Sequence, residues 1–302
     1  MSQSRRAAAL RRLLDTTHWA GETPTLRLLG FDAVVRADDP VVTRALTELY
    51  GPLSCDEPAE HIITFTRTRD DICELHLDGA RILHTESPAV AFSHLIWELN
   101  RQTIEHTTGR TLVHASAAAR GGQAVVLVGP MGSGKSTLVA ALVQAGFGYV
   151  TDEVVAINPE TLLVDPYPKP ISLGGAGGSV PDALAALQTL RPAGLESYLG
   201  DHWLVAPERV RPGAVADRTM IGAVVVPDYV PHAPARLEPL SRPEAVLTLA
   251  EHTFQLGDRP EDHLDALARV VAEASCHRLI SGDPDGAVAA LRPLLERAEA
   301  AT

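Results

Sequence analysis

Lysine is almost absent from this chain of 302 residues. Lys135 and Lys169 are the only two, so arginine makes up 24 of the 26 basic residues. Aromatic residues are also scarce, at 4%, and the formal net charge is −12. A general nucleic-acid binder needs basic stripes that neutralise phosphates and aromatic rings on which bases stack, so we expect no nucleic-acid partner. Because arginine serves wherever only positive charge is needed, the two lysines mark positions to inspect for chemistry.

Cysteine is scarce, and long apolar runs are missing. Cys55, Cys73 and Cys276 are odd in number and far apart, with no spacing typical of a zinc site or a disulfide framework. No run of about 18 apolar residues is present, so we expect no membrane span. Arg11 and Arg12 interrupt the apolar stretch that a secretion signal would need, and the arginine-rich first fifteen residues are typical of a solvated helix face. These absences predict a cytoplasmic protein with free thiols.

Apolar residues are nevertheless plentiful, at 45%, which excludes wholesale disorder. The length favours one large domain or two modest ones. Residues 1–109 mix strand-like and helical patterns and carry no recognisable chemistry, which indicates a small α+β domain and a candidate for selecting an acceptor. Its expected strands are 26–35, 61–66, 75–77 and 80–84, the last two joined at Asp78-Gly79, and its expected helices are 41–50 and 89–107.

Residues 110–302 show a different pattern, in which strands alternate with helices after a glycine-rich loop. This alternation predicts an α/β nucleotide-binding core. The expected strands are 112–118, 124–128, 147–150, 154–157 and 221–226, and the expected helices are 135–145, 243–250, 261–274 and 287–300. A stretch rich in proline and glycine, 165–178, lies between the expected strands 154–157 and 221–226.

The glycine-rich loop carries the strongest chemical signal. It reads Gly129-Pro130-Met131-Gly132-Ser133-Gly134-Lys135-Ser136, followed by Thr137, and fits G-x-x-x-x-G-K-[ST] between a buried strand and a helix. Glycines allow backbone N–H groups to curl around phosphate oxygens, and the helix adds its free N–H groups and the positive end of its dipole. Lys135 would reach the β- and γ-phosphates, and Ser136 would ligate Mg²⁺. The loop predicts binding of a nucleoside triphosphate, ATP, with Mg²⁺.

Acidic residues follow at the end of the next expected strand, where Asp152 comes seventeen residues after Lys135 and Glu153 is next to it. A carboxylate beside a phosphate loop can bind the metal or accept a proton from an attacking hydroxyl. His114 lies fifteen residues before Gly129, on the strand 112–118. A lone histidine on a strand is more often structural, so its role remains open on these residues alone.

Cationic residues further along the chain are candidates for contacting phosphate or substrate. Lys169 lies among Pro166, Pro168 and Pro170, which restrict the backbone and could aim it; a solvent-exposed lysine on a rigid turn is the alternative. Arg209 and Arg211 are weaker candidates for stabilising the charge of a transferring phosphoryl group. The glycines of 174–178 suggest a loop that closes over the acceptor, or a simple connector.

Taken together, Val113-His114-Ala115-Ser116, the loop 129–136 and the segment 149–155 resemble the HPr kinase/phosphorylase family of P-loop kinases. The resemblance covers about fifty residues, 110–160. The segment 165–174 replaces that family's Glu-x-Arg-Gly-Leu-Gly signature, and the layout is more similar to HPr-kinase-related tailoring kinases, such as those that phosphorylate lasso-peptide precursors. The resemblance therefore implies an α/β fold and an acceptor other than HPr.

The resemblance implies a role for each site residue. Asp152 would take the proton from an acceptor hydroxyl, His114 and Glu153 would support substrate, phosphate or metal, and Lys135 would act on the phosphate; Ser136, Asp152 and Glu153 would hold Mg²⁺. The family also suggests a homo-oligomer. We expect an ATP-Mg²⁺-dependent kinase acting on a hydroxyl, most simply Ser or Thr of a peptide or protein. A small-molecule hydroxyl kinase and a nucleotide-binding regulator or ATPase are the alternatives.

Overall fold

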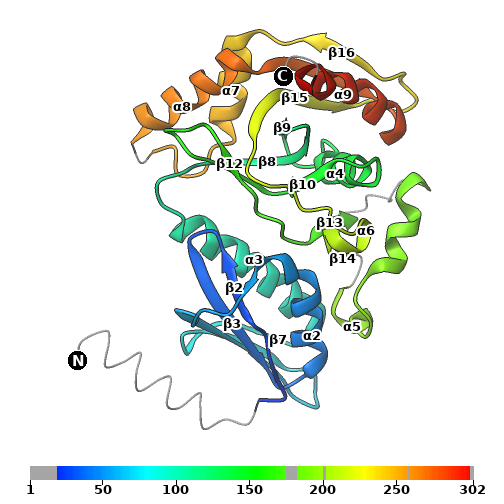
Figure 1. Cartoon of the computed structure of the whole chain (residues 1–302). Helices are drawn as coiled ribbons and strands as arrows, with labels where there is room; N and C mark the ends of the chain where they lie inside the picture. Colours follow the sequence, from blue (N-terminus) through cyan, green and yellow to red (C-terminus); the bar gives the residue numbers. More distant parts are fainter. Residues whose placement is uncertain (1–18, 175–181, 200–201, 258, 300–302) are drawn as a thin grey trace. The chain divides into compact units, whose positions relative to one another are not determined.

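The computed structural model describes residues 19–174, 182–199, 202–257 and 259–299 of the chain. The chain divides into two compact units (Figure 1). Unit 1 comprises residues up to Thr107 together with Arg191–His202, and unit 2 comprises Thr108–Leu190 and Trp203 onward. Both are mixed α/β units. The arginine-rich first fifteen residues, and most of the glycine loop expected at 174–178, lie outside the described part.

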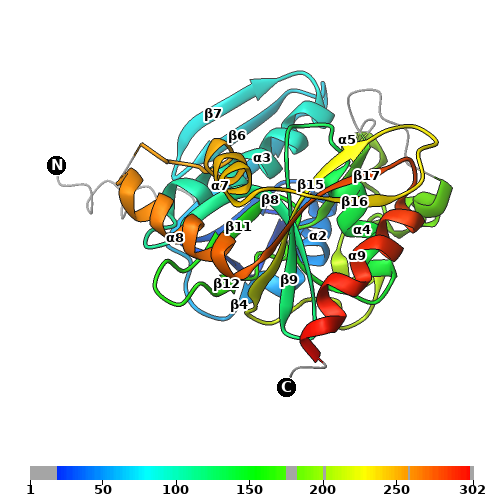
Figure 2. The same ribbon diagram turned by 90° about the horizontal axis from the view of Figure 1, so that it is seen from above.

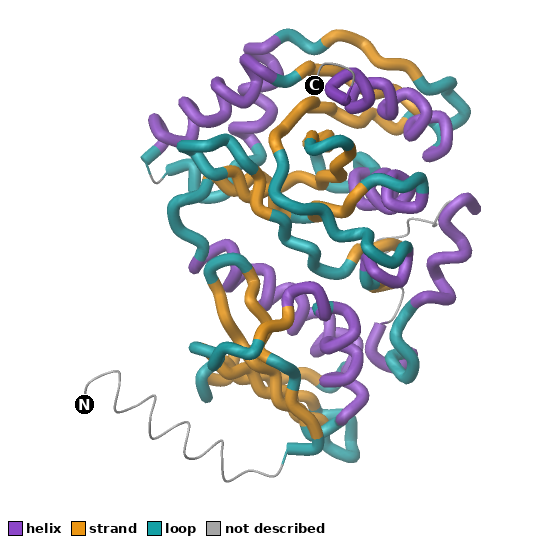
Figure 3. The backbone as a smooth tube through the Cα atoms, viewed as in Figure 1, coloured by secondary structure: helices purple, strands orange, loops and turns teal. Residues whose placement is uncertain are grey.

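Unit 1 is built on a sheet, whose strands are drawn in orange in Figure 3. The strand order is β4-β2-β3-β5-β6-β7, and β1 pairs with β3. The β3–β5 pair is parallel, whereas the other pairs are antiparallel. The strands are β1 (Gly21–Glu22), β2 (Thr25–Leu28), β3 (Phe31–Ala37), β4 (Ser54–Cys55), β5 (His61–Arg67), β6 (Cys73–Leu77) and β7 (Ala80–Thr85). The helical elements are α2 (Pro40–Leu49), η1 (Gly51–Leu53), α3 (Pro88–His106) and α5 (Glu196–Leu199).

The expected elements of unit 1 are confirmed with one exception. Both long helices begin as the sequence suggests, with Asp39 and Ser87 as N-caps and a proline in the first turn. The single strand expected at 26–35 is wrong. The chain instead turns at Leu29, whose φ is 57°, and Gly30, where a Cβ would meet the backbone of the α3 end. Apolar residues on both sides of a tight turn read as one strand because the pattern does not show the reversal.

Unit 2 contains a sheet of order β12-β11-β8-β9-β15-β17-β16, in which β10 also pairs with β8. Strands β9, β15 and β17 are parallel neighbours, and the remaining pairs are antiparallel. The strands are β8 (Thr111–Arg120), β9 (Gln123–Val128), β10 (Gly148–Thr151), β11 (Val154–Ile157), β12 (Val164–Asp165), β15 (Met220–Tyr229), β16 (Arg236–Pro239) and β17 (Ser275–Ser281). A separate pair of strands is formed by β13 (Ile171–Gly174) and β14 (His202–Val205).

Helices cover both faces of this sheet (Figure 2). One face packs on α4 (Lys135–Gln144) and α9 (Pro284–Glu299), and the other on α7 (Arg242–Glu251) and α8 (Pro260–Glu273). Two shorter elements, η2 (Asp182–Leu190) and α6 (Pro207–Val210), complete the unit. The side chains of β9 alternate between the two cores, which explains its uninterrupted apolar run.

The structure confirms the strands and helices expected in unit 2 to within a few residues and adds others. Strand β13 lies within the proline- and glycine-rich stretch and β12 ends at its first residue, and β14, β16 and β17 were not expected from the pattern. Across the described residues, no helix combines the length and apolar character that crossing a membrane requires.

Candidate functional site

The glycine-rich loop joins β9 to α4 in unit 2. Gly132 and Gly134 have φ values of 82° and 86°, a left-handed conformation that other residues adopt only with strain. Gly134 is the N-cap of α4, so the N–H groups of the first helical turn point toward the loop. Within the described part of the chain, the Ser133 Oγ is buried and has no hydrogen-bond partner. A loop with unsatisfied polar groups at a helix N-terminus is suited to hold an anion.

Lys135 is folded into this loop. Its Nζ donates hydrogen bonds to the carbonyl oxygens of Gly129, at 2.7 Å, and Pro130, at 2.9 Å, and the residue is only 7% exposed. Burial lowers the pKa of Lys135, and the nearby negative charge of Glu153 opposes this effect. Neutral carbonyl oxygens thus accept the hydrogen bonds of the lysine, and the negative charge of Glu153 favours its protonated form. Ser136 and Thr137 follow, half-buried, in the first turn of α4.

The acidic pair lies in the turn between β10 and β11, and both of these strands pair with β8. The Thr151 Oγ1 accepts hydrogen bonds from the N–H groups of Glu153 and Val154, each at 3.2 Å, which fixes the turn. The Ala115 N–H donates to the Glu153 carbonyl at 3.2 Å, and Ala115 also pairs with Val128, the last residue before the loop. The acidic pair therefore lies one strand away from the glycine-rich loop.

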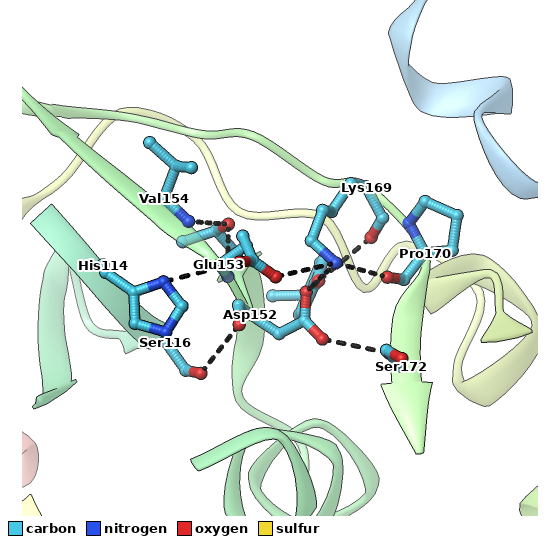
Figure 4. A network of polar contacts seen from close by, with 10 residues as sticks. His114, Ser116, Asp152, Glu153, Val154, Lys169, Pro170 and Ser172 are labelled. Carbon is cyan, nitrogen blue, oxygen red and sulfur yellow. Dashed lines mark hydrogen bonds and ion pairs between the residues drawn. The ribbon is translucent and has the colours of Figure 1, made fainter. Parts of the chain in front are cut away.

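Asp152 is enclosed, with none of its side chain exposed (Figure 4). Its Oδ1 lies 2.7 Å from the Lys169 Nζ and 3.2 Å from the Tyr149 hydroxyl, and its Oδ2 accepts a hydrogen bond from the Ser172 N–H at 3.0 Å. The Ser116 hydroxyl donates to the Asp152 carbonyl oxygen at 3.1 Å. Both oxygens of the carboxylate already have partners.

Lys169 is nearly as buried as its partner, with 5% of its side chain exposed. Besides the contact with Asp152, its Nζ donates to the Pro170 carbonyl at 3.2 Å and lies 3.7 Å from the Glu153 Oε2. Burial alone would lower the pKa of Lys169, but the charges of Asp152 and Glu153 outweigh it and raise the pKa. Burial and the neighbouring Asp152 likewise raise the pKa of the Tyr149 hydroxyl.

Glu153 is the more accessible member of the pair, with 31% of its side chain exposed. Its Oε1 lies 3.4 Å from the Nδ1 of His114, whose side chain is equally exposed. Burial would raise the pKa of Glu153, but the hydrogen bond to His114 and the charges of Lys169 and Lys135 lower it to about 2. The imidazole of His114 stands edge-on to Phe254, with ring centroids 5.7 Å apart. Glu153 is thus an ionised carboxylate between His114 and both lysines.

The arginine candidates lie elsewhere. The Arg211 guanidinium donates to the Phe147 carbonyl at 2.9 Å, next to the start of β10, whereas Asp152 follows the end of that strand. Arg209 is exposed on α6. The structure brings together His114, Asp152, Glu153 and Lys169, and it directs the Arg211 side chain to another part of the unit.

Several contributors to the site carried no signal in the sequence. Ser172 acts through its backbone N–H, which any residue could supply. Tyr149 sits on a buried strand, where a tyrosine reads as core, and Phe254 reaches the site from a turn after α7. Only the rarity of tyrosine in this chain, five in all, could have drawn attention to Tyr149.

The groups that could bind a nucleotide differ from those that could bind a metal. The loop fits phosphate, because the Ser133 Oγ and the N–H groups of the first turn of α4 remain to be satisfied. The Ser136 hydroxyl is the loop group suited to Mg²⁺. Asp152 does not fit a directly bound metal, because both carboxylate oxygens are taken. Within the described residues, no group of three or more His, Cys, Asp or Glu side chains is arranged to hold a metal ion.

Comparisons with known proteins show a distant structural likeness. No protein-family model matches the chain, and no curated protein matches it. Among solved structures, the chain is similar to the Hpr(Ser) kinase/phosphatase from Coxiella burnetii, with a TM-score of 0.32 and 13% sequence identity, over 63% of this chain and 96% of that chain. A TM-score this low does not assign a function, so the contacts of the site itself must support any proposal.

Proposed function

We propose that this protein is an ATP-Mg²⁺-dependent phosphotransferase that transfers the γ-phosphate to a hydroxyl group, that of Ser or Thr in a peptide or protein. The observation that carries the proposal is the placement of an ionised carboxylate, Glu153 with His114, one strand away from a loop suited to phosphate. Phosphoryl transfer needs these two elements close together: a cradle for the transferred group and an acidic group where the acceptor enters.

The loop would hold the triphosphate. Its backbone N–H groups and the N-terminus of α4 favour phosphate oxygens, and the orphaned Ser133 Oγ gains a partner there. Lys135 would exchange the carbonyls of Gly129 and Pro130 for the β- and γ-phosphates, which are stronger partners because they are charged. The Ser136 hydroxyl would hold Mg²⁺, which neutralises charge on the phosphates when it is bound.

In the transfer step, the bond between the γ-phosphorus and the oxygen that bridges it to the β-phosphorus breaks, and its electron pair leaves with ADP. A new bond forms between the γ-phosphorus and the acceptor oxygen, whose proton passes to a carboxylate. The resemblance gives this last role to Asp152. We propose Glu153 instead, because its side chain has exposed surface and that of Asp152 has none. The loose transition state demands little of this base, so a carboxylate with a pKa of about 2 can serve.

His114 would hold Glu153 in position. Its backbone N–H donates to the His252 carbonyl at 2.7 Å, and its ring stands against Phe254, so both its main chain and its imidazole are held. Its Nδ1 meets the Glu153 Oε1 and leaves the Oε2 beside Lys169. The acceptor hydroxyl would approach this exposed carboxylate between His114 and the loop.

The proposal is tested by incubating the full chain with ATP, Mg²⁺ and a degenerate peptide library that carries a central Ser or Thr, and detecting phosphopeptides by mass spectrometry. We expect phosphate on the hydroxyl-bearing peptides and loss of the product with Lys135→Ala. Arg236→Ala, an exposed cation of unit 2 paired with Glu238, is the matched control and should leave transfer unchanged. Transfer by Lys135→Ala at the wild-type rate would overturn the proposal. So would rapid ATP hydrolysis without any acceptor dependence, which would favour an ATPase.

A further inference from the structure

The ammonium group of Lys169 occupies an unusual position in the site, because it lies between two adjacent carboxylates. Its Nζ is 2.7 Å from the Asp152 Oδ1, 3.7 Å from the Glu153 Oε2 and 3.2 Å from the Pro170 carbonyl oxygen (Figure 4). Two carboxylate oxygens and a backbone carbonyl are the kind of oxygen ligands that a hard divalent cation takes in a protein. Lys169 therefore stands where such a cation would bind.

Its surroundings hold the lysine in this place. The Tyr167 N–H donates to the Val150 carbonyl and the Lys169 N–H donates to the Tyr167 carbonyl, which fastens this segment to the end of β10. The Tyr149 hydroxyl lies within hydrogen-bond distance of both the Lys169 carbonyl, at 3.0 Å, and the Asp152 Oδ1. The flanking prolines restrict the backbone further. Lys169 is thus part of the interior and has little freedom to swing toward a ligand.

The chemistry of lysine suits this position and that of arginine does not. An ammonium is a compact point charge that can donate in three directions, and here it lies within hydrogen-bond distance of two oxygens and 3.7 Å from a third. A planar guanidinium could not point its donors at three oxygens around one centre. This requirement accounts for a lysine in a chain that otherwise uses arginine almost throughout.

We propose that the Lys169 ammonium takes the place of a divalent metal between Asp152 and Glu153. Lys169 is thus a positioning residue, which holds the Asp152 carboxylate in place. The pair then binds no metal of its own. One consequence rests on the proposed function: the Mg²⁺ of the reaction enters with the nucleotide and is held by Ser136 and the phosphates. Glu153 is left to face the acceptor hydroxyl.

The test is the binding of Mn²⁺ to the full chain without nucleotide, followed by the electron paramagnetic resonance signal of free Mn²⁺. We expect the wild-type site to bind no Mn²⁺ and Lys169→Ala to gain a site of at least about ten-fold higher affinity, because two carboxylates lose their cation. Adding Glu153→Gln to Lys169→Ala should remove the gained site. Wild-type protein that binds Mn²⁺ without nucleotide, and loses it with Asp152→Asn, would overturn the inference. A folded Lys169→Ala protein that gains no site would also overturn it.

A second variant covers the case in which Lys169→Ala does not fold, since it leaves a carboxylate buried and unpaired. Lys169→Met combined with Asp152→Asn removes both charges at nearly constant volume, and we expect it to fold and to bind no Mn²⁺. Binding of Mn²⁺ by the wild type that this double variant loses would place a metal on the acidic pair and overturn the inference. ATP binding measured on the same wild-type sample separates the two proposals, because a failure to bind ATP contradicts the proposed function and leaves the Mn²⁺ comparison valid.

Discussion

The two lysines of the chain lie in the same unit, and both act on Glu153, yet their surroundings differ. Lys135 donates to two neutral carbonyl oxygens of its own loop, and burial lowers its pKa. Lys169 donates to a carboxylate and a carbonyl, and its charged neighbours raise its pKa. A lysine held only by carbonyls gains by moving to a phosphate, whereas a lysine held by a buried carboxylate would leave an uncompensated charge behind. The comparison separates a cation that is available to a ligand from one that is committed to the structure.

The largest expected effect is a difference in protein stability between the alanine variants of the two lysines. Lys169→Ala should lower the free energy of unfolding by about 3–5 kcal/mol, because Asp152 remains buried without its partner. Lys135→Ala should change it by about 1 kcal/mol or less, since no buried charge is left unpaired. Chemical denaturation of both variants checks this prediction. Equal losses would remove the distinction.

A smaller effect is expected in the loop around Lys135. Gly134→Ala places a side chain at a φ of 86° and should cost about 1–2 kcal/mol through backbone strain alone, because a Cβ there would meet no other atom within 4 Å. Gly51 is the matched control, since a Cβ there also meets nothing and no left-handed φ is required. Thermal unfolding of both alanine variants makes the comparison. A loss with Gly51→Ala as large as that with Gly134→Ala would show that loop strain is not the cause.

A smaller loss of stability than that of Gly134→Ala is expected for a substitution beside Lys169. Tyr149→Phe removes a hydroxyl that meets both the Asp152 Oδ1 and the Lys169 carbonyl, and should cost about 1 kcal/mol. The Lys169–Asp152 pair itself should persist, since Ser172 and Pro170 still hold it. Urea denaturation measures the loss. A loss as large as that of Lys169→Ala would show that the hydroxyl, and not the ion pair, holds the site together.

The smallest effect concerns Glu153, which lies between the two lysines. Its folded-state pKa of about 2 is below the ordinary value of 4.5, so its ionised form stabilises the folded protein above pH 4.5, and this contribution is lost as the pH falls toward 2. Because the side chain is partly exposed, we expect less than about 1 kcal/mol. The difference in melting temperature between wild type and Glu153→Gln, followed from pH 6 downward, should shrink below pH 4.5. A difference that grows in acid would contradict the sign.

The loop and the acidic strand could be predicted because their signals are local: glycines, a lysine and a hydroxyl at fixed spacing, and carboxylates at the end of a strand. The role of Lys169 could not, because its partner lies seventeen residues away and a proline-rich stretch reads equally well as an exposed turn. Arg211 shows the same limit, since the sequence does not reveal where a long side chain points. The inclusion of Arg191–His202 in unit 1 follows from contacts distant in sequence, such as the Tyr198 hydroxyl on Asp39 at 2.7 Å and the Tyr198 ring on Phe65 and Phe92.

The most direct measurement is the affinity of the full chain for ATP with Mg²⁺, determined by isothermal titration calorimetry for wild type, Lys135→Ala and the control Arg236→Ala. We predict that wild type and Arg236→Ala bind ATP equally well and that Lys135→Ala binds at least about ten-fold more weakly, because it loses the charge aimed at the phosphates. If Lys135→Ala binds ATP as tightly as wild type, or if wild type does not bind ATP, the loop is not the phosphate site and the proposed function is contradicted.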